Sequence, residues 1–169
     1  LRTSPVPRSL SQASFPEAKT SSCQNALLAS LEPRGAQTYE WLFLNRSGFV
    51  TEVRTGNLFI VAARAYGDSA PMLLTPPVLG ILDGVTRRFV LECASAARIP
   101  AKETALTRHD VWNAAEVFLT NTSWEILPVA QLDGRRIGKQ VPGKITRKLQ
   151  RIFKEKVQHE CLRQKPNGR

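Results

Sequence analysis

The sequence has few cysteines and no long apolar run, and each of these absences excludes a class of protein. Its 169 residues include only Cys23, Cys93 and Cys161. Three is an odd number, and the spacing is too wide for a zinc site or a disulfide framework, which favours a reducing compartment. No stretch approaches the roughly 18 to 20 apolar residues of a membrane-spanning helix, and no signal-peptide core is present. We therefore expect a soluble, cytoplasmic protein without a membrane partner.

Acidic residues are also scarce, because 24 Lys and Arg residues outnumber 14 Asp and Glu residues and give a net charge of +10. Residues 144–169 hold nine of the cations. This pattern is typical of a solvated helix face followed by a basic, flexible tail at residues 159–169. A nucleic-acid-binding module is the less favoured alternative. The two histidines, His109 and His159, are expected at the surface or at helix ends, so the sequence predicts no metal site.

The spacing of apolar residues predicts interspersed strands and helices. Helices are expected over residues 20–31, from Asp83 or Gly84 to the residue before Pro100, and over 107–114, where Thr107 is the expected cap. A last helix is expected near the C-terminus, where one apolar stripe is formed by Ile145, Leu149, Ile152, Phe153 and Val157. Strands are expected in YEWLFL and GFVTEV, which flank a turn at NRSG, and in NLFIVAA, PMLLTP, AKETAL, EVFLTN and EILPVAQL, with a further turn at DGRRIG. The pattern predicts an α/β or α+β domain with a curved, mixed sheet.

The N-terminal segment differs in composition from the rest of the chain. Residues 1–18 are rich in Ser, Pro and Arg and show little periodicity. They predict an irregular linker or the truncated edge of a longer domain. The folded domain is therefore expected at residues 19–158.

Two segments could bind an anion. Gly84 precedes a predicted helix, so the free amides of Val85 and Thr86 point outward at the positive end of the helix dipole. Asn121 and Thr122 lie in a polar turn between two apolar strands, where backbone amides are also free. Each pattern alone is more typical of an ordinary capped helix or polar turn.

Two charged residues also have suggestive positions. Lys19 directly precedes a predicted helix, where burial and the positive helix end lower the pKa of a lysine. A neutral lysine is a nucleophile toward aldehydes. Glu52 ends an apolar strand, either as a surface residue or as the buried partner of a cation, and the pattern alone mildly favours the surface.

Five stretches in order resemble the class IV aminotransferases. They are Lys19 before a helix with LLASLE, then GFVTEVRTGNLFIV, LLTPPVLGILDGVTRRFVLECA, AAEVFLTNTSWEILPV and LDGRRIGKQVPGKIT. The family uses pyridoxal 5'-phosphate and includes branched-chain and D-amino acid aminotransferases and aminodeoxychorismate lyase. The resemblance implies the large, cofactor-binding domain of the fold-type IV scaffold, a curved mixed sheet or pseudo-barrel with flanking helices.

The resemblance also implies roles for single residues. Lys19 matches the lysine that bonds covalently to the cofactor aldehyde and moves the substrate proton. Glu52 matches the acid that binds the protonated pyridine nitrogen and keeps the ring an electron sink. Phosphate-binding positions are matched by Val85, Thr86 and Thr122, with Asn121 beside them, and Asn57 matches a residue that supports the glutamate strand.

The resemblance implies transfer of an amino group from an amino acid to a 2-oxo acid in a homodimer. The alternative within the family is the lyase, in which the same site releases pyruvate. Family enzymes also have a smaller N-terminal domain that this sequence does not contain, so we expect impaired binding or turnover. A non-catalytic scaffold on the same fold is a further alternative.

Overall fold

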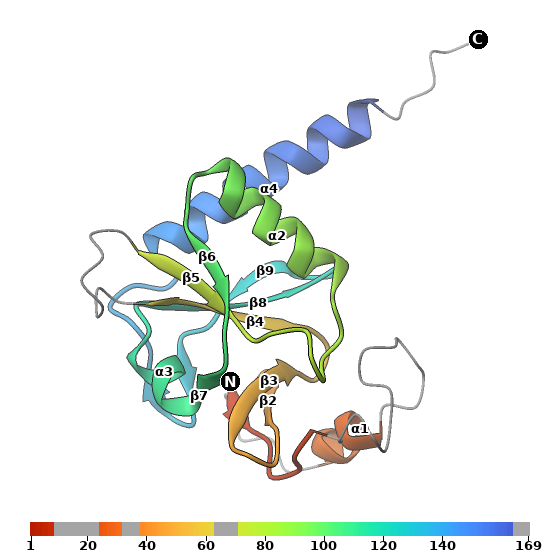
Figure 1. Ribbon diagram of the computed structural model, residues 1–169, viewed down its shortest axis with the longest axis vertical. Helices are drawn as coiled ribbons and strands as arrows, with labels where there is room; N and C mark the ends of the chain where they lie inside the picture. The colour runs from red at the N-terminus through yellow and green to blue at the C-terminus, as the bar shows by residue number, and fades with distance from the viewer. Residues whose placement is uncertain (9–23, 32–37, 63–70, 164–169) are drawn as a thin grey trace.

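The computed structural model describes residues 1–8, 24–31, 38–62 and 71–163, which form three layers (Figure 1). In chain order the elements are β1 (Arg2–Thr3), α1 (Gln24–Leu31), β2 (Trp41–Leu44), β3 (Phe49–Val53), β4 (Asn57–Ala62), β5 (Met72–Thr75), α2 (Val85–Ala96), β6 (Ala101–Glu103), β7 (Leu106–Thr107), α3 (Arg108–Asn113), β8 (Glu116–Asn121), β9 (Glu125–Pro128), β10 (Gln131–Leu132), β11 (Arg135–Arg136) and α4 (Lys144–Arg163). Helices α2 and α4 cover one face of the central sheet.

Two sheets make up most of the domain. The central sheet has five strands in the order β6-β5-β4-β8-β9, and the second has four in the order β1-β2-β3-β7. Strands β5 and β6 pair in parallel, and the other neighbours in the central sheet pair antiparallel. This mixed arrangement of helices and curved sheets confirms the predicted α/β class.

Alternation along β4 supplies apolar side chains to two cores, one on each face of the central sheet. Leu58 and Ile60 belong to the core shared with the four-stranded sheet. Phe59 faces the core under α2 and α4, where its ring stacks on Phe118 of β8 at 5.1 Å. Successive side chains of a strand point to opposite faces, so a strand buried on both faces is apolar throughout.

Two local predictions are confirmed. The turn between β2 and β3 lies at NRSG, where Asn45 Oδ1 accepts bonds from the amides of Ser47 and Phe49, and Gly48 has a φ of 83°. Thr107 caps α3 through a reciprocal arrangement with Asp110. Both motifs are encoded by residues close together in the sequence, which is why the pattern predicted them.

Three boundaries differ from the prediction. The stretch AKETAL is not one strand, because β6 pairs with β5 while β7 crosses to β3. DGRRIG contains β11, which pairs with β10, in addition to the turn. Helix α4 continues through residues 159–163, so this part of the predicted flexible tail is helical. Within the described ranges no helix is long and apolar enough to cross a membrane.

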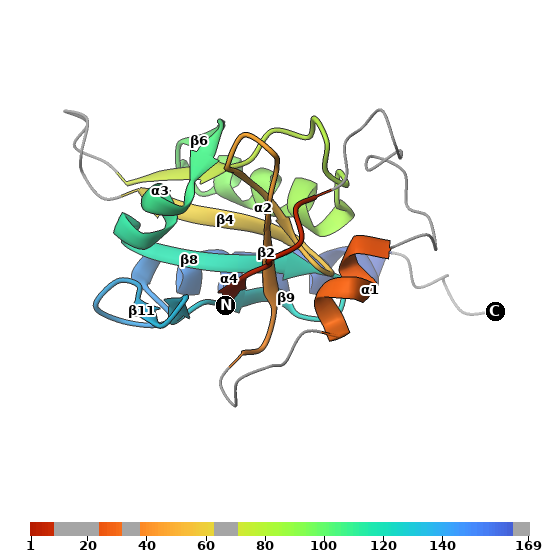
Figure 2. The same ribbon diagram turned by 90° about the horizontal axis from the view of Figure 1, so that it is seen from below.

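Residues 1–8 lie along the edge of the four-stranded sheet and do not form a separate linker (Figure 2). β1 pairs in parallel with β2, and the amides of Ser4 and Arg8 donate to the carbonyls of Leu42 and Leu44 at 2.8 Å each. Such pairing depends on a strand some 40 residues away in sequence, so local composition did not indicate it. Residues 9–18 of the predicted linker lie outside the described residues.

Candidate functional site

Five of the six predicted site residues lie in three segments that meet near the start of β4, and Lys19 lies outside the described residues. The five are Glu52 in β3, Val85 and Thr86 at the start of α2, Asn121 at the end of β8 and Thr122 in the turn that follows.

Asn57, the first residue of β4, lies between the two predicted anion-binding segments. It is the register partner of Thr120 at the end of β8. Its side-chain Nδ2 donates to the carbonyl of Leu82 at 2.9 Å. A Cβ on Gly84 would lie 2.3 Å from Asn57 Oδ1, so the backbone before α2 packs directly on this side chain. The two segments therefore flank one buried asparagine.

Glu52 is buried, with 5% of its surface exposed, so the mild preference of the sequence for a surface position is wrong. Its Oε1 forms an ion pair with Arg8 Nη2 at 2.5 Å, and its Oε2 accepts a bond from the Leu82 amide at 3.2 Å. Burial raises the pKa of Glu52 to about 7, while Arg8 and the Leu82 amide oppose that rise. The carboxyl therefore exchanges its proton near neutral pH.

The start of α2 is open to an anion. Gly84 is the N-cap residue, and among the described residues no side chain accepts a bond from the first amides of the helix. The first regular bond runs from the Arg88 amide to the Gly84 carbonyl. The amides of Val85 and Thr86 therefore have no acceptor within the helix, and the helix dipole adds positive potential there. This end of α2 can bind a phosphate.

The β8–β9 turn is organised by Asn121. Its Oδ1 accepts bonds from the amides of Ser123 and Trp124 at 2.9 and 2.7 Å, and its Nδ2 donates to the Thr55 carbonyl at 3.2 Å. Since both ends of this amide are engaged, Asn121 shapes the turn that presents the exposed Thr122.

Thr120, on the same face of the central sheet as Asn57, has a buried hydroxyl without a hydrogen-bond partner among the described residues. A buried hydroxyl costs free energy when it is unpaired. An unpaired polar atom next to Asn57 indicates that this region suits a polar group.

Arg8 is a site residue that the sequence did not single out. It lies in the segment expected to be a linker, yet its guanidinium reaches the buried carboxylate of Glu52. No motif surrounds it in the sequence. The pairing of residues 1–8 with β2 places this cation, and that pairing depends on the tertiary structure.

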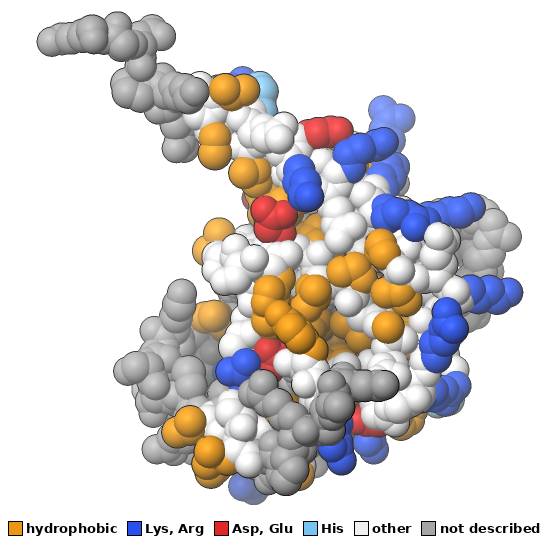
Figure 3. Space-filling model, turned by 180° about the vertical axis from the view of Figure 1, so that it is seen from behind, with side chains coloured by type: hydrophobic (Ala, Val, Ile, Leu, Met, Phe, Trp, Pro, Cys, Tyr) orange, Lys and Arg blue, Asp and Glu red, His pale blue; other side chains and the backbone are white. Residues whose placement is uncertain are grey.

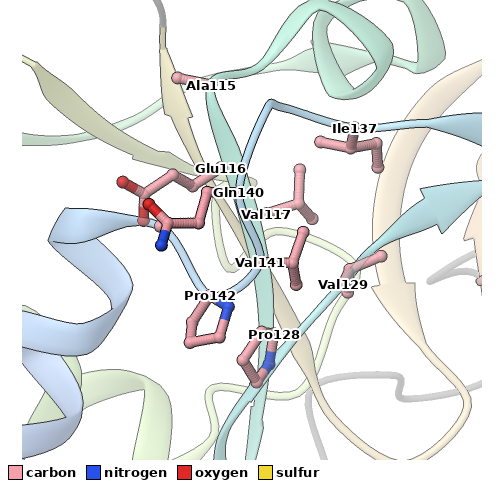
Figure 4. Close-up of a pocket in the computed structure, with 10 residues that line it drawn as sticks. Ala115, Glu116, Val117, Pro128, Val129, Ile137, Gln140, Val141 and Pro142 are labelled. Atoms are coloured by element: carbon pink, nitrogen blue, oxygen red, sulfur yellow. The ribbon is translucent and has the colours of Figure 1, made fainter.

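Two other hollows lie away from these residues. The one in Figure 4, at the start of α4, is lined by residues such as Glu116, Val141 and Pro142 and leaves no space for a water molecule. A shallow groove between α2 and α4 is lined by Phe89, Glu92, Glu155, Lys156, His159 and Glu160. Among the described residues no group of His, Cys, Asp and Glu could hold a metal ion.

The positive charge is not confined to one small patch. Figure 3 shows Lys and Arg side chains spread along one side of the molecule and at its base, around a central apolar area.

Comparison with known proteins identifies the family. The family model described as amino-transferase class IV matches residues 1–132. Since this match covers more than half of the chain, the chain belongs to the class IV aminotransferase family, as the ordered motifs predicted.

Individual relatives agree with this assignment. A putative branched-chain-amino-acid aminotransferase of Methanocaldococcus jannaschii is 38% identical over 141 residues, which are 83% of this chain and 46% of that protein. A D-alanine aminotransferase of Bacillus licheniformis is 32% identical over 129 residues, 76% of this chain and 43% of that protein.

The fold is shared with solved structures. The structure of a branched-chain amino acid aminotransferase from Thermobaculum terrenum in its PLP form is 31% identical and matches with a TM-score of 0.83, over 92% of this chain and 50% of that one. The chain therefore spans about half the length of the relatives it matches, and the predicted fold type is confirmed.

Proposed function

We propose that this chain is the cofactor-binding domain of a pyridoxal-phosphate-dependent aminotransferase, which moves an amino group from an amino acid to a 2-oxo acid as a homodimer. The observation that carries the proposal is a buried acid joined to an uncapped helix start. Leu82 makes the link, because its amide donates to Glu52 and its carbonyl accepts from Asn57, which packs on Gly84. These groups suit the two ends of one ligand.

Glu52 would hold the proton of the cofactor's ring nitrogen. The carboxylate already accepts a bond from Leu82 and is paired with Arg8, which keeps both oxygens fixed in direction. A pKa of about 7 in the unliganded chain would fall once a protonated ring nitrogen lies beside the carboxylate. Pyridoxal phosphate, when bound, supplies a ring that withdraws electrons from the substrate carbon that loses its proton.

The phosphate would bind at the start of α2. The amides of Val85 and Thr86 and the Thr86 hydroxyl are its proposed donors there, since Gly84 leaves the helix uncapped. Thr122 is a proposed further donor from the β8–β9 turn, and Asn121 supports it by holding the turn.

Lys19 is the proposed residue that bonds to the cofactor aldehyde and then moves the substrate proton. This role rests on its match to the family motif and on the chemistry of a neutral lysine. One relative is named as a branched-chain-amino-acid aminotransferase and another as a D-alanine aminotransferase. The amino donor of this chain is therefore open between them.

Reduction by borohydride tests the proposal. We expect the 169-residue chain to gain a visible absorbance band with pyridoxal phosphate, and borohydride should then attach the cofactor to Lys19, which peptide mapping would identify. Lys19→Ala should lose the label, while Lys148→Ala, a change on exposed α4, should retain it. Labelling of a different lysine, or none, would refute the assignment. A panel of amino donors compared with aminodeoxychorismate, with pyruvate release as the readout, separates aminotransferase from lyase.

A further inference from the structure

Arg87 is a charged side chain in the core, with only 1% of its surface exposed. It is the third residue of α2. Its Nη2 donates to the carbonyl of Pro76 and pairs with Glu103, both at 3.0 Å, and its Nη1 lies 3.4 Å from Asp83 Oδ1. Its Nε has no hydrogen-bond partner among the described residues.

The partners of Arg87 lie at both ends of one loop. Residues 76–84 connect β5 to α2, and Arg87 binds Pro76 at the first end and Asp83 at the last. Glu103 at the end of β6 adds a third attachment from the neighbouring strand. A buried guanidinium carries a large desolvation cost, which these contacts must offset. If this position only had to fill space in the core, an apolar residue would give the same or greater stability.

We propose that Arg87 is a positioning residue that holds the start of α2 where its open amides can bind the cofactor phosphate. This inference rests on the proposed function. Glu52 is placed by β3 and paired with Arg8, and its contact with the loop held by Arg87 is a single bond from the Leu82 amide at 3.2 Å. We therefore expect Arg87 to act mainly on the phosphate end of the ligand.

The adjacent Arg88 provides a matched control. Arg88 carries the same charge as Arg87 in the same helical turn. Its side chain is 59% exposed and contacts the loop only through Asp83 at 3.7 Å, so it does not join the two ends of the loop. If positive charge alone favours binding of the phosphate, removing either Arg87 or Arg88 should weaken that binding. If Arg87 positions the helix start, only its removal should do so.

The test compares the dissociation constants of pyridoxal 5'-phosphate and pyridoxal, which lacks the phosphate. We expect Arg87→Met to weaken pyridoxal phosphate binding about 10- to 100-fold, which corresponds to the loss of about one charged hydrogen bond between the displaced helix amides and the phosphate. Pyridoxal binding should change less than about 2-fold. Arg87→Lys keeps the charge but cannot bridge several acceptors with a planar fork, so it should show most of the same loss. Arg88→Met should bind both ligands as the wild type does.

Each other outcome overturns the inference. Equal losses for Arg88→Met and Arg87→Met, or full retention by Arg87→Lys, would assign the effect to charge and not to position. Equal weakening of both ligands would show a merely structural role. If Arg87→Met does not fold, Glu103→Gln decides, because this side chain is 41% exposed and its loss should still weaken pyridoxal phosphate selectively by about 2- to 5-fold. Unchanged selectivity there overturns the inference, whereas a wild type that binds no pyridoxal phosphate overturns the proposed function itself.

Discussion

The two helices that cover the central sheet begin in opposite ways. At the start of α4, the carboxylate of Glu116 accepts bonds from the amides of Ile145 and Thr146 and from the Thr146 hydroxyl, at 2.7 to 2.9 Å. At the start of α2, no side chain among the described residues takes that place. One helix start is closed by the protein's own anion and the other is left open.

At both helix starts, nevertheless, a glycine lets the backbone pack closely against a side chain from the sheet. A Cβ on Gly143 would collide with the side chain of Glu116, as one on Gly84 would collide with Asn57. At α4 the close approach brings a carboxylate to the amides, and at α2 it brings a neutral amide whose Nδ2 is bonded to the Leu82 carbonyl. Among the described residues, the first amides of α2 thus have no side-chain acceptor, whereas α4 is closed by a carboxylate. An uncapped helix start is the arrangement expected of a site for an external anion.

Removing the closed cap should have a large effect on stability. Glu116→Ala leaves two amides and a hydroxyl without their acceptor, and we expect a loss of about 3 kcal/mol of unfolding free energy. This corresponds to a fall in Tm of roughly 6–12 °C for a domain of this size. Thermal unfolding followed by circular dichroism measures it.

The matched control for this change is Glu92→Ala, at an exposed position of α2, which should alter stability by less than about 0.5 kcal/mol. Pyridoxal phosphate binding should remain normal in Glu116→Ala under conditions where the variant is folded. Comparable stability of Glu116→Ala and Glu92→Ala would mean that the cap by Glu116 contributes little to the free energy of unfolding. The difference between the two helix starts would then not be a difference in stability.

A pH series sharpens the comparison, because Glu52, the buried acid that Leu82 links to the open start, is held differently from Glu116. Glu52 has one backbone donor and Arg8, and burial raises its pKa from 4.5 to about 7. A raised carboxyl pKa stabilises the fold below about pH 4.5, and this contribution is lost as the pH rises through 7. The shift corresponds to about 3 kcal/mol.

We therefore expect the unliganded wild type to lose about 3 kcal/mol more than Glu52→Gln between pH 4.5 and 8, since the amide does not titrate. Urea unfolding at a series of pH values measures the difference. Glu155→Gln, on the exposed side of α4, should follow the wild type. Parallel curves for wild type and Glu52→Gln would contradict the raised pKa.

The same comparison shows what could be predicted from the sequence. Periodicity predicted α2 and α4, and the ordered motifs predicted Glu52 and the open start of α2. The cap by Glu116 could not be predicted, because it lies about 30 residues before the amides it binds. Arg8 and Arg87 were missed for the same physical reason. Contacts across sheets and loops bury Arg87 and partly bury Arg8, and no local pattern distinguishes such an arginine from a solvated one.

The smallest predicted effect concerns Gly84. Its φ of −65° and ψ of 136° are accessible to any residue, so Gly84→Ala adds no backbone strain. Its methyl group would lie 2.3 Å from Asn57 Oδ1, and either this buried side chain or the helix start must move. We expect a loss of about 1–2 kcal/mol of stability and, if the helix start moves, about 10-fold weaker binding of pyridoxal phosphate.

A double-mutant cycle with Asn57→Ser determines whether that contact is the cause. The shorter serine leaves room for the new methyl group, so the double variant should be more stable than the sum of the single changes by about 1 kcal/mol. Additive losses would mean that the methyl group meets no resistance from Asn57 and that glycine is not needed for close approach. Positive coupling in stability, together with weak pyridoxal phosphate binding by Gly84→Ala, would show that Asn57 sets the position of the open start of α2. At α4 the side chain in the equivalent place is Glu116, whose carboxylate also binds the helix amides.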